Sequence, residues 1–378
     1  MPTTVNYPKE FKGFAITDPK DWDHPKLTSY EPKPMSDFDV DIEIECCGIC
    51  GSELHALQNN WSDEPLACLS AKIGPKSQVV GHEIVGHVVN VGNKVTKFHK
   101  GERVAMGAQC GSCMKCNRCI NGHEQFCTGC IETYCSEYPD GYVSQGGYAS
   151  HVRAHEHYIV HVPPQLDSKH VAPLQCGGLT VYSPIKRALK DVTDEKPRVA
   201  IIGIGGLGHM AIMISKALGC EVWALSTSDS KKEDAKKMGA DHFVNTTEKD
   251  VWDGLQDTFH LILSCTISYT KLPFESLLGT LVATGKFISV GLPSKDQPLE
   301  IHPMQLAAHG VSFSASHLGS IKELEELLAL SVKHDIKPWV EELPISEDSL
   351  HEGLTRLNKG DVRYRFTLTN FHEVFGTG

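Results

Sequence analysis

The stretch 198–208 reads RVAIIGIGGLG, a continuous apolar run that ends in glycines. Gly203, Gly205 and Gly208 form the pattern G-x-G-x-x-G, and the helix-like HMAIMISKALG follows. In such a strand–turn–helix unit the first glycine allows a tight turn. The second lets a pyrophosphate approach the backbone, and the third lets the helix pack on the strand. The stretch therefore predicts a dinucleotide-binding fold, with a plain structural glycine loop as the alternative.

Further short apolar runs follow the glycine loop. They begin with EVWALS at 221–226 and continue with FHLILSC, GKFISVGL and VSFSAS, with helical stretches between some of them. Strands that alternate with helices are typical of parallel βαβ units. We therefore expect residues 168–313 to form a doubly wound parallel sheet in an α/β fold.

The end of the second strand indicates which dinucleotide is bound. An NAD site usually has Asp or Glu there, about 20 residues after the glycines, to hold the ribose 2′-hydroxyl. This chain has Ser226 instead, followed by Thr227, Ser228 and Lys231. Hydroxyl groups and a cation suit a 2′-phosphate, which a carboxylate would repel. The pattern favours NADP(H), although Asp229 is near enough to keep a polar loop with a surface lysine as the alternative.

The chain on either side of this region has a different composition and hydrophobic pattern. Residues 1–167 are rich in Gly, Pro and short alternating runs such as DVDIEIECCGIC, which are typical of half-buried strands. After residue 313, the amphipathic helix pattern of IKELEELLALSVKHDI leads to the strand-like PWVEELPI and DVRYRFTLT. Because 378 residues exceed one ordinary core, we expect two domains.

Composition and charge narrow the class of protein. The formal net charge is −11, which disfavours binding to nucleic-acid phosphates. No apolar run approaches the roughly 20 residues of a membrane helix, and the N-terminus lacks a secretory signal pattern. We therefore expect a cytoplasmic protein without nucleic-acid or membrane partners. Thiols stay reduced in the cytosol, so clustered cysteines there are more often metal ligands than disulfides.

Five of the fourteen cysteines lie in CGSCMKCNRCINGHEQFC, residues 110–127. Four of these have the spacing C-x2-C-x2-C-x7-C, namely Cys113, Cys116, Cys119 and Cys127. Four thiolates can surround one Zn²⁺ with no open position, as in structural zinc sites. A register that starts at Cys110 and leaves Cys127 out is the alternative. The favoured register assigns no role to Cys110, Cys130 or Cys135.

A second potential zinc site is dispersed along the chain. Cys50 lies in CGICGSELH, His82 in VVGHEIVG and Cys176 in CGGLTVYSP. Two thiolates and one imidazole would leave the fourth zinc position for water or substrate, which is the catalytic kind of site. Taken singly, each residue has an alternative interpretation as a small or hydrogen-bonded core residue, against which the sequence contexts argue.

Together these motifs resemble those of the zinc-dependent medium-chain alcohol dehydrogenases, and within them the yeast type of the NADP(H)-dependent cinnamyl alcohol dehydrogenase branch. The family's order is kept, over nearly the whole chain, by CGICGS, VVGHEIVG, SCMKCNRC, DGYVSQGGYA, CGGLTVYSP, GIGGLG, KKMGADH and DVRYRFTL. The resemblance implies a β-rich GroES-like catalytic domain, residues 1–167 and 314–378, that holds both zinc sites. A Rossmann domain for NADP(H), residues 168–313, is inserted into it. The resemblance also implies an active site in the cleft and a homodimer joined through the Rossmann domains.

The resemblance also implies roles for individual residues. The catalytic zinc is expected on Cys50, His82 and Cys176, and Glu83 is a carboxylate that can replace water on the metal. The four clustered cysteines are expected to hold a second, structural zinc. The expected cofactor-binding residues are Gly203, Gly205, Gly206, Leu207, Gly208, Ser226, Thr227, Ser228, Lys231, Val290 and Arg365. The last of them matches a tail arginine near the cofactor.

The implied activity is hydride transfer between NADPH and an aldehyde or alcohol, with Ser52 and His55 matching the family's proton relay. Cinnamyl-type aromatic and medium-chain aliphatic aldehydes are the expected substrates. A polyol or secondary-alcohol dehydrogenase, or a specialised natural-product reductase on the same fold, is the alternative. A non-catalytic zinc-binding or thiol-sensing protein is a third class, against which the full ligand set and the cofactor loop argue.

Two features depart from the family's pattern. Glu53 stands where the family usually has Asp as partner of the ligand histidine, and its extra methylene alters that contact. The segment between Trp61 and Val80 is longer than usual and is expected beside the substrate cleft. Trp61 and Tyr134 are hypotheses for aromatic residues of that cleft, with plain packing as an equal alternative.

Overall fold

The computed structural model describes residues 8–61, 66–269, 272–293 and 299–376. The chain forms two compact units. The first comprises residues 1–176, 320–332 and 337–378, and the second comprises residues 177–319 and 333–336.

The first unit contains most of the short strands, and its elements in chain order are β1 (Phe11–Ile16), η1 (Pro19–Asp21), β2 (Lys26–Tyr30), β3 (Asp39–Ile49), α1 (Gly51–Leu57), α2 (Ala67–Ser70), β4 (Gln78–Val79), β5 (Ile84–Val91), β6 (Arg103–Met106), β7 (Gln109–Gly111), α3 (Asn117–Ile120), η2 (Glu124–Phe126), β8 (Ile131–Glu132), β9 (His151–His155), η3 (Glu156–Tyr158), β10 (Ile159–His161), α4 (Ser168–Val171), η4 (Ala172–Gln175), α10 (Ile321–His334), β17 (Val340–Pro344), α11 (Glu347–Asn358), β18 (Arg365–Thr369) and α12 (Phe371–Phe375). The unit extends past the expected boundary after residue 167 because α4 packs against β3, β5 and β18.

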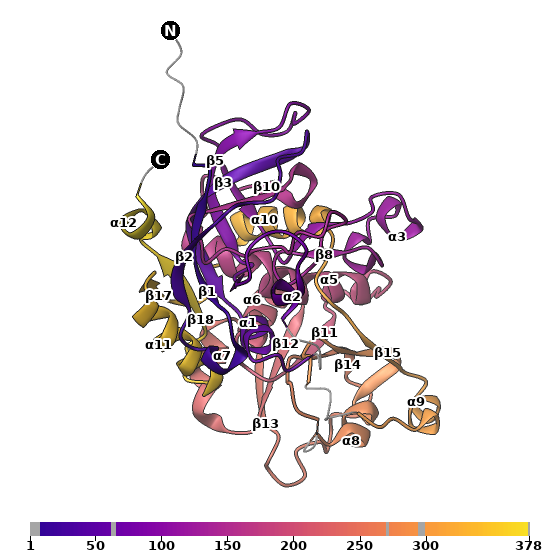
Figure 1. Cartoon of the computed structure of the whole chain (residues 1–378). Coiled ribbons are helices and arrows are strands. Elements are labelled where there is room, and N and C mark those ends of the chain that lie inside the picture. The colour runs from indigo at the N-terminus through magenta and orange to yellow at the C-terminus, as the bar shows by residue number, and fades with distance from the viewer. Residues whose placement is uncertain (1–7, 62–65, 270–271, 294–298, 377–378) are drawn as a thin grey trace. The chain divides into compact units, whose positions relative to one another are not determined.

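A seven-stranded sheet forms the centre of the first unit, in the order β10-β6-β5-β3-β18-β17 with β9 also paired to β3. Strand β18 pairs antiparallel with β3, so that Phe366 lies opposite Ile49. In Figure 1 the yellow C-terminal strands accordingly lie beside the indigo N-terminal part of the chain. The sheets β2-β1-β4 and β7-β8 are smaller. The N-terminal and C-terminal parts of the chain therefore build one unit together, as the resemblance implied.

Strand β3 differs from its expected pattern. The sequence alternation predicted a half-buried strand, but only Glu43 and Glu45 of β3 are not fully buried. Segments α4, η4 and α12 contact the strand. Consecutive residues of β3 are buried, so side chains on both of its faces are covered. The last buried residues of β3 lead directly into Cys50 at the start of α1. The strand therefore fixes one end of the candidate active site.

The second unit is built as the glycine loop predicted, and its elements are α5 (Gly177–Leu189), β11 (Arg198–Ile202), α6 (Gly208–Ala217), β12 (Glu221–Ser226), η5 (Asp229–Lys231), α7 (Lys232–Lys237), β13 (His242–Asn245), β14 (Phe259–Ser264), α8 (Phe274–Gly279), β15 (Leu281–Ser289), α9 (Pro303–His309) and β16 (Ser312–Ala315). Six parallel strands form one sheet in the order β13-β12-β11-β14-β15-β16. The strand order reverses between β11 and β14. Open parallel sheets bind ligands at the carboxyl ends of their strands at such a point, and the glycine loop follows β11.

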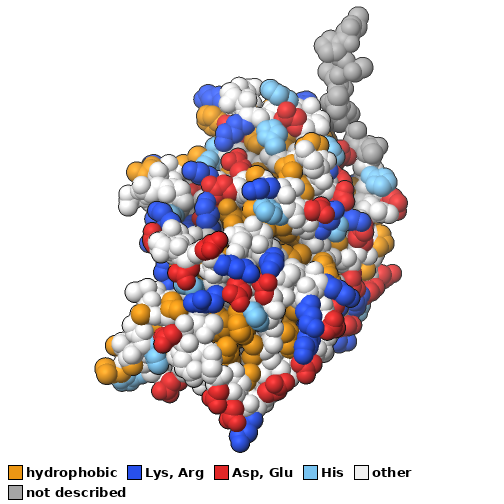
Figure 2. Space-filling view, turned by 180° about the vertical axis from the view of Figure 1, so that it is seen from behind, with side chains coloured by type: hydrophobic (Ala, Val, Ile, Leu, Met, Phe, Trp, Pro, Cys, Tyr) orange, Lys and Arg blue, Asp and Glu red, His pale blue; other side chains and the backbone are white. Residues whose placement is uncertain are grey.

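The surface agrees with the even mixing of charges along the sequence. On the face shown in Figure 2, acidic and basic side chains are interspersed over most of the surface. Within the described ranges, the helices are all too short or too polar to span a bilayer.

Candidate active site and second metal centre

Three segments of the first unit bring the expected catalytic ligands together. Cys50 lies at the N-terminus of α1, His82 and Glu83 lie directly before β5, and Cys176 follows η4. Their metal-binding atoms all lie within 4.8 Å of one another, and all four side chains are buried. The structure thus assembles residues that are far apart in the chain into one enclosed cluster.

The cluster fits a zinc ion by its distances and by its unpaired atoms. Cys50 Sγ and Cys176 Sγ are 4.0 Å apart. Two thiolates that share a tetrahedral zinc lie about 3.8 Å apart, given zinc–sulfur bonds of about 2.3 Å. His82 Nε2 and Glu83 Oε2 are buried and have no hydrogen-bond partner. Buried polar atoms are costly to leave unpaired, and a metal ion would satisfy these two.

Charges around the cluster favour ionised ligands. The hydrogen bond from the Cys176 thiol, with the nearby charges of Arg365 and His82, holds the pKa of Cys50 well below its ordinary value despite burial. Arg365 donates from Nη2 to Glu83 Oε1, and both side chains are buried. Burial raises the pKa of Glu83 to about 7, although Arg365 opposes this shift. The pair places one cation next to the two thiols and thereby stabilises thiolate at this site.

Arg365 therefore lies beside Glu83 in the ligand cluster of the first unit. The resemblance implied a tail arginine near the cofactor, and that role remains a prediction. Arg365 has a second role through its contact with Glu83. Its guanidinium neutralises a buried carboxylate that would otherwise repel the thiolates.

Two residues contact the imidazole of His82 at its Nδ1 nitrogen. Glu53 Oε1 lies 2.7 Å from His82 Nδ1, and Glu53 Oε2 accepts a hydrogen bond from the Cys50 backbone N–H at 2.5 Å. Tyr134 Oη lies 3.1 Å from the same Nδ1. The longer side chain of Glu53 thus reaches two ligand residues at once. The hypotheses for Tyr134 were a cleft aromatic or a packing residue, and its contact with His82 was not anticipated.

The expected proton-relay residues lie on α1 beside the cluster. Ser52 Oγ is 3.8 Å from Cys50 Sγ, and His55 follows three residues later, on the same side of the helix. His55 Nδ1 is buried and has no hydrogen-bond partner. Burial lowers the pKa of His55, which keeps the imidazole neutral near pH 7. The ring of Trp61 stacks on that of His55 at a centroid distance of 4.6 Å.

The long segment after Trp61 contributes to the core. Residues 62–65 lie outside the described residues, but the segment then enters α2, where Leu66 and Cys68 are buried in the main hydrophobic cluster. Its expected role beside the substrate cleft remains a prediction. Part of its extra length is used for packing.

The second metal centre forms in the segment between β7 and β8. The structure brings four sulfur atoms together, those of Cys113, Cys116, Cys119 and Cys127. Four of their sulfur–sulfur distances are 3.5, 3.5, 3.8 and 3.9 Å, close to the edges of a zinc tetrahedron. Backbone N–H groups of Lys115 and Cys116 lower the pKa of Cys113 to about 6, so its thiolate forms readily. The four residues fit a structural zinc ion.

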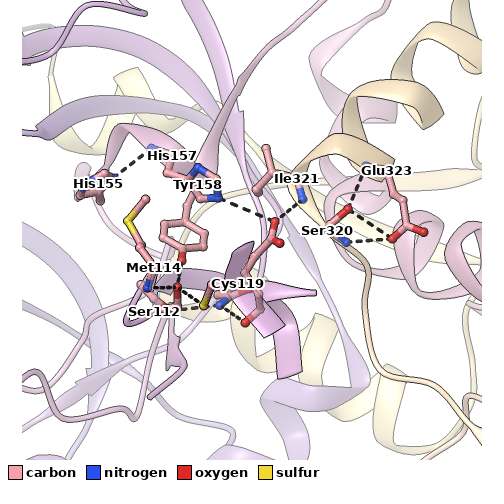
Figure 3. A network of polar contacts seen from close by, with 12 residues as sticks. Ser112, Met114, Cys119, His155, His157, Tyr158, Ser320, Ile321 and Glu323 are labelled. Atoms are coloured by element: carbon pink, nitrogen blue, oxygen red, sulfur yellow. Dashed lines mark hydrogen bonds and ion pairs between the residues drawn. The ribbon is translucent and has the colours of Figure 1, made fainter. Parts of the chain in front are cut away.

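Polar contacts tie this centre to the rest of the first unit (Figure 3). Ser112 Oγ lies 3.3 Å from Cys119 Sγ and accepts a hydrogen bond from Tyr158. Glu124 accepts a hydrogen bond at 2.9 Å from the backbone N–H of Ile321, the first residue of α10. Burial acts to raise the pKa of Glu124, but the bonds from His157 and Ile321 hold it below its ordinary value. The link to α10 could not be predicted from sequence patterns, because its two ends are 197 residues apart.

Cys110 does not join the four sulfur atoms. Its Sγ donates to the carbonyl of Glu132 at 3.2 Å and lies 3.1 Å from Tyr138 Oη. Burial raises the pKa of the Cys110 and Cys135 thiols to about 12, and burial also raises that of Cys130. The register that starts at Cys110 is therefore not the one the structure forms. These three thiols lie outside the cluster of four sulfur atoms.

A third group of potential ligands lies on the surface, and it consists of Asp23, His24 and His351. Both imidazoles contact the Asp23 carboxylate, at 2.9 and 3.3 Å. The group is therefore a cluster of ion pairs at the surface.

The glycine loop of the second unit has the geometry expected for a bound pyrophosphate. Gly203 adopts φ 86°, which favours glycine. A Cβ atom on Gly208 would lie 1.8 Å from the Gly203 carbonyl oxygen, whereas one on Gly205 would meet no atom within 4 Å. The third glycine thus allows close packing of α6, and the second faces open space. Gly206 and Leu207 lie between them and lead into α6.

The residues expected around the 2′-phosphate lie at the end of β12. Ser226 is the last residue of the strand and is half-buried, while Thr227 and Ser228 are exposed. Lys231 Nζ donates to the carbonyl of Ile204 at 2.6 Å, which places its charge at the glycine loop. Asp229 accepts a hydrogen bond from Asn245. Val290 follows β15 and is buried, so it lies at the same carboxyl edge of the sheet.

Comparison with known proteins follows the same division of the chain. Residues 36–164 match the family model described as alcohol dehydrogenase GroES-like domain, and residues 206–333 match the one described as zinc-binding dehydrogenase. The fold and the two cysteine-containing sites thus define a zinc-containing dehydrogenase with an inserted Rossmann domain.

Individual relatives narrow this class. The chain is 46% identical to NADP-dependent alcohol dehydrogenase 6 of Saccharomyces cerevisiae, over 98% of this chain and 99% of that protein. It is 36% identical to vomilenine reductase of Rauvolfia serpentina, with 96% of each covered. A cinnamyl alcohol dehydrogenase of Sorghum bicolor superposes with a TM-score of 0.85 at 30% identity, covering 96% of this chain and 98% of that one. The chain belongs to the zinc-dependent medium-chain alcohol dehydrogenases.

Proposed function

We propose that this dehydrogenase reduces aldehydes with NADPH, and that cinnamyl-type aromatic and medium-chain aliphatic aldehydes are its substrates. The observation that carries the proposal is the buried cluster of Cys50, His82 and Cys176, with an unpaired ligand nitrogen on the imidazole. The cofactor preference is supported by Ser226 at the end of β12 and by Lys231 at the end of η5. It is also supported by the NADP-dependent relative and by the cinnamyl alcohol dehydrogenase of Helicobacter pylori solved with NADP(H).

The chain's own residues provide the chemistry around the carbonyl group. Cys50, His82 and Cys176 would hold the catalytic zinc, which when bound polarises the carbonyl oxygen as a Lewis acid. Ser52 lies next to the ligand Cys50, where its hydroxyl can donate a proton to the substrate oxygen. His55, one turn further along α1, can pass a proton toward Ser52. Burial lowers its pKa, so the imidazole is neutral near pH 7 and can accept a proton at one nitrogen while the other donates.

Cofactor binding would use the second unit. The backbone around Gly205 and the N-terminus of α6 would hold the pyrophosphate, which the positive end of the helix dipole attracts. Ser226, Thr227 and Ser228 offer hydroxyl groups, and Lys231 adds a cation. These groups suit a 2′-phosphate better than a free ribose hydroxyl.

A substrate panel tests the proposal. The purified protein should reduce cinnamaldehyde-type and medium-chain aldehydes, and its kcat/KM with NADPH should be at least about tenfold higher than with NADH. It should also contain two zinc ions per chain. Mannitol and a complex natural-product aldehyde belong in the panel, because relatives named mannitol dehydrogenase and vomilenine reductase are 36–37% identical. Turnover of mannitol alone would reassign the substrate. No turnover of any compound by the zinc-loaded protein would favour a binding protein.

We also propose a homodimer in the cytoplasm. Strand β16 is the edge of the parallel sheet, and Ser312, Ser314 and Ala315 on it are exposed. Met304 on the preceding α9 is 65% exposed. An exposed edge strand, together with an exposed apolar side chain on the preceding helix, supports pairing with a second copy of the chain.

A proline at Ala315 should convert such a dimer to monomer. The N–H of Ser316 bonds to Ser289 of β15, and alternation along the strand then directs the N–H of Ala315 away from β15, toward the partner. Proline removes that donor without disturbing the pairing with β15. Ala315→Ser keeps the donor and should stay dimeric. Light scattering measures both masses, and a dimeric Ala315→Pro variant would exclude this edge as the interface.

A further inference from the structure

The sulfur atoms of the second metal centre differ in the groups that approach them. Backbone N–H groups donate to the sulfur atoms of Cys113 and Cys127, at 3.4 and 3.3 Å. Cys119 Sγ has a side-chain neighbour, the hydroxyl of Ser112, at 3.3 Å. Because groups that contact metal ligands tune the metal site, this hydroxyl is a candidate for a role at the metal.

The Ser112 hydroxyl carries one hydrogen, and its other contacts leave that hydrogen for the sulfur. Its oxygen accepts a hydrogen bond from Tyr158 Oη at 2.6 Å and another from the backbone N–H of Met114 at 3.2 Å. These two bonds use both lone pairs of the oxygen. A metal-bound Cys119 is a thiolate, which can only accept. The hydrogen of Ser112 is therefore donated to Cys119 Sγ, along the contact drawn in Figure 3.

Tyr158 connects Ser112 to the central sheet of the first unit. It ends η3, which lies between β9 and β10, and these strands pair with β3 and β6. Its side chain is completely buried, and its ring packs T-shaped against that of His157 at a centroid distance of 4.9 Å. A hydroxyl fixed in this way keeps the Ser112 oxygen in place before a metal binds. Two hydroxyl groups thus connect the sheet to one ligand of the metal centre.

From these contacts we propose that Ser112 is a positioning residue for the metal at the four cysteines. Its hydroxyl donates to the Cys119 thiolate, stabilises the charge on that sulfur and holds it in the tetrahedron, while Tyr158 sets the direction of the hydroxyl. The proposal rests on the structural zinc of the proposed function and adds two residues to that site. Partners of metal ligands typically change metal affinity by about 10- to 100-fold when they are removed.

Zinc release to a chelator tests this hydrogen bond in the full-length protein. In Ser112→Ala we expect one of the two zinc ions to leave about tenfold faster than in the wild type, while the other leaves at the wild-type rate. Ser112→Thr keeps a hydroxyl on the same carbon and should release both ions at close to the wild-type rates. Tyr158→Phe keeps the Ser112 hydroxyl but removes the bond that directs it, so its release rate should lie between those of the wild type and Ser112→Ala.

Two control variants remove a similar hydroxyl without touching the cluster. Ser136 Oγ accepts a backbone N–H at 3.1 Å, as Ser112 Oγ does at 3.2 Å. Tyr138 Oη lies 3.1 Å from the thiol of Cys110, which is outside the four sulfur atoms. Ser136→Ala and Tyr138→Phe should therefore release both zinc ions at the wild-type rates.

A spectrum distinguishes a hydrogen bond to sulfur from a general loosening of the segment. With cobalt in the metal sites, the sulfur-to-cobalt charge-transfer band should move to longer wavelength in Ser112→Ala and return in Ser112→Thr, because a hydrogen bond lowers the energy of the sulfur lone pairs. Wild-type zinc release in Ser112→Ala would overturn the proposal, and so would faster release with an unchanged band. A wild type with a single zinc ion, which Cys50→Ser removes, would instead overturn the four-cysteine centre itself.

Discussion

Replacement of Cys50 by serine should leave one zinc ion per chain and lower kcat/KM for aldehyde reduction by at least about a thousandfold. A neutral hydroxyl is a poor substitute for a thiolate ligand, and the three-residue site would lose one of its two sulfur atoms. Polarisation of the carbonyl by the metal stabilises the transition state by several kcal/mol, and each 1.36 kcal/mol corresponds to a factor of ten in rate. Metal analysis and initial rates with NADPH check both parts.

Cys46→Ser is the matched control. Cys46 is buried in β3, four residues before Cys50, and burial raises the pKa of its thiol well above the ordinary value. Its variant should keep two zinc ions and retain activity, although stability can fall because a hydroxyl replaces a buried thiol. A Cys50→Ser protein with two zinc ions and wild-type rates would remove Cys50 from the metal site.

Replacement of Ser226 by aspartate should lower kcat/KM with NADPH by at least about thirtyfold and leave the value with NADH equal or higher. Two like charges about 6 Å apart near a protein surface repel by roughly 3 kcal/mol, and salt reduces this value. An aspartate at this position would also hold a ribose 2′-hydroxyl. The KM for each cofactor, measured at one fixed ionic strength, reports the change in preference.

A variant that adds the same charge at the opposite edge of the sheet is the control for Ser226→Asp. Thr258 precedes β14, so it lies at the amino ends of the strands, while Ser226 ends β12 at their carboxyl ends. Thr258→Asp adds the same charge to the second unit and should leave the preference unchanged. If both variants lose NADPH equally, the effect comes from net charge, and the 2′-phosphate does not lie at Ser226.

The sequence predicts those parts of the sites that depend on local spacing. The glycine loop between β11 and α6 is a continuous segment whose residue types are required by its turn, and it folds as expected. The four sulfur atoms of the second centre come from fifteen consecutive residues, 113–127, so their spacing alone restricts the ligand set. The type of fold follows from the same local signals, because strand and helix periods are visible within each run.

Contacts between distant segments were not predictable in the same way. Tyr134 and His82 are 52 residues apart, and a tyrosine carries no sign of whether its hydroxyl faces a ligand or solvent. The burial of β3 on both faces was missed because the helices that contact it come from residues 168–175 and 371–375. The pairing of Arg365 with Glu83 also joins two segments that only the folded chain brings together.

The position of β18 between β3 and β17 has a consequence for synthesis on the ribosome. Chains emerge from the N-terminus, and domains fold as their residues become available. All six strands of the nucleotide-binding unit precede residue 316, whereas the end of β3, residues 47–49, lacks its partner β18 until residues 365–369 have been translated. The nucleotide-binding unit can therefore complete its sheet first. Over that interval the apolar edge of β3 is open to pairing with other nascent chains, and a chain that stops before β18 keeps it open permanently.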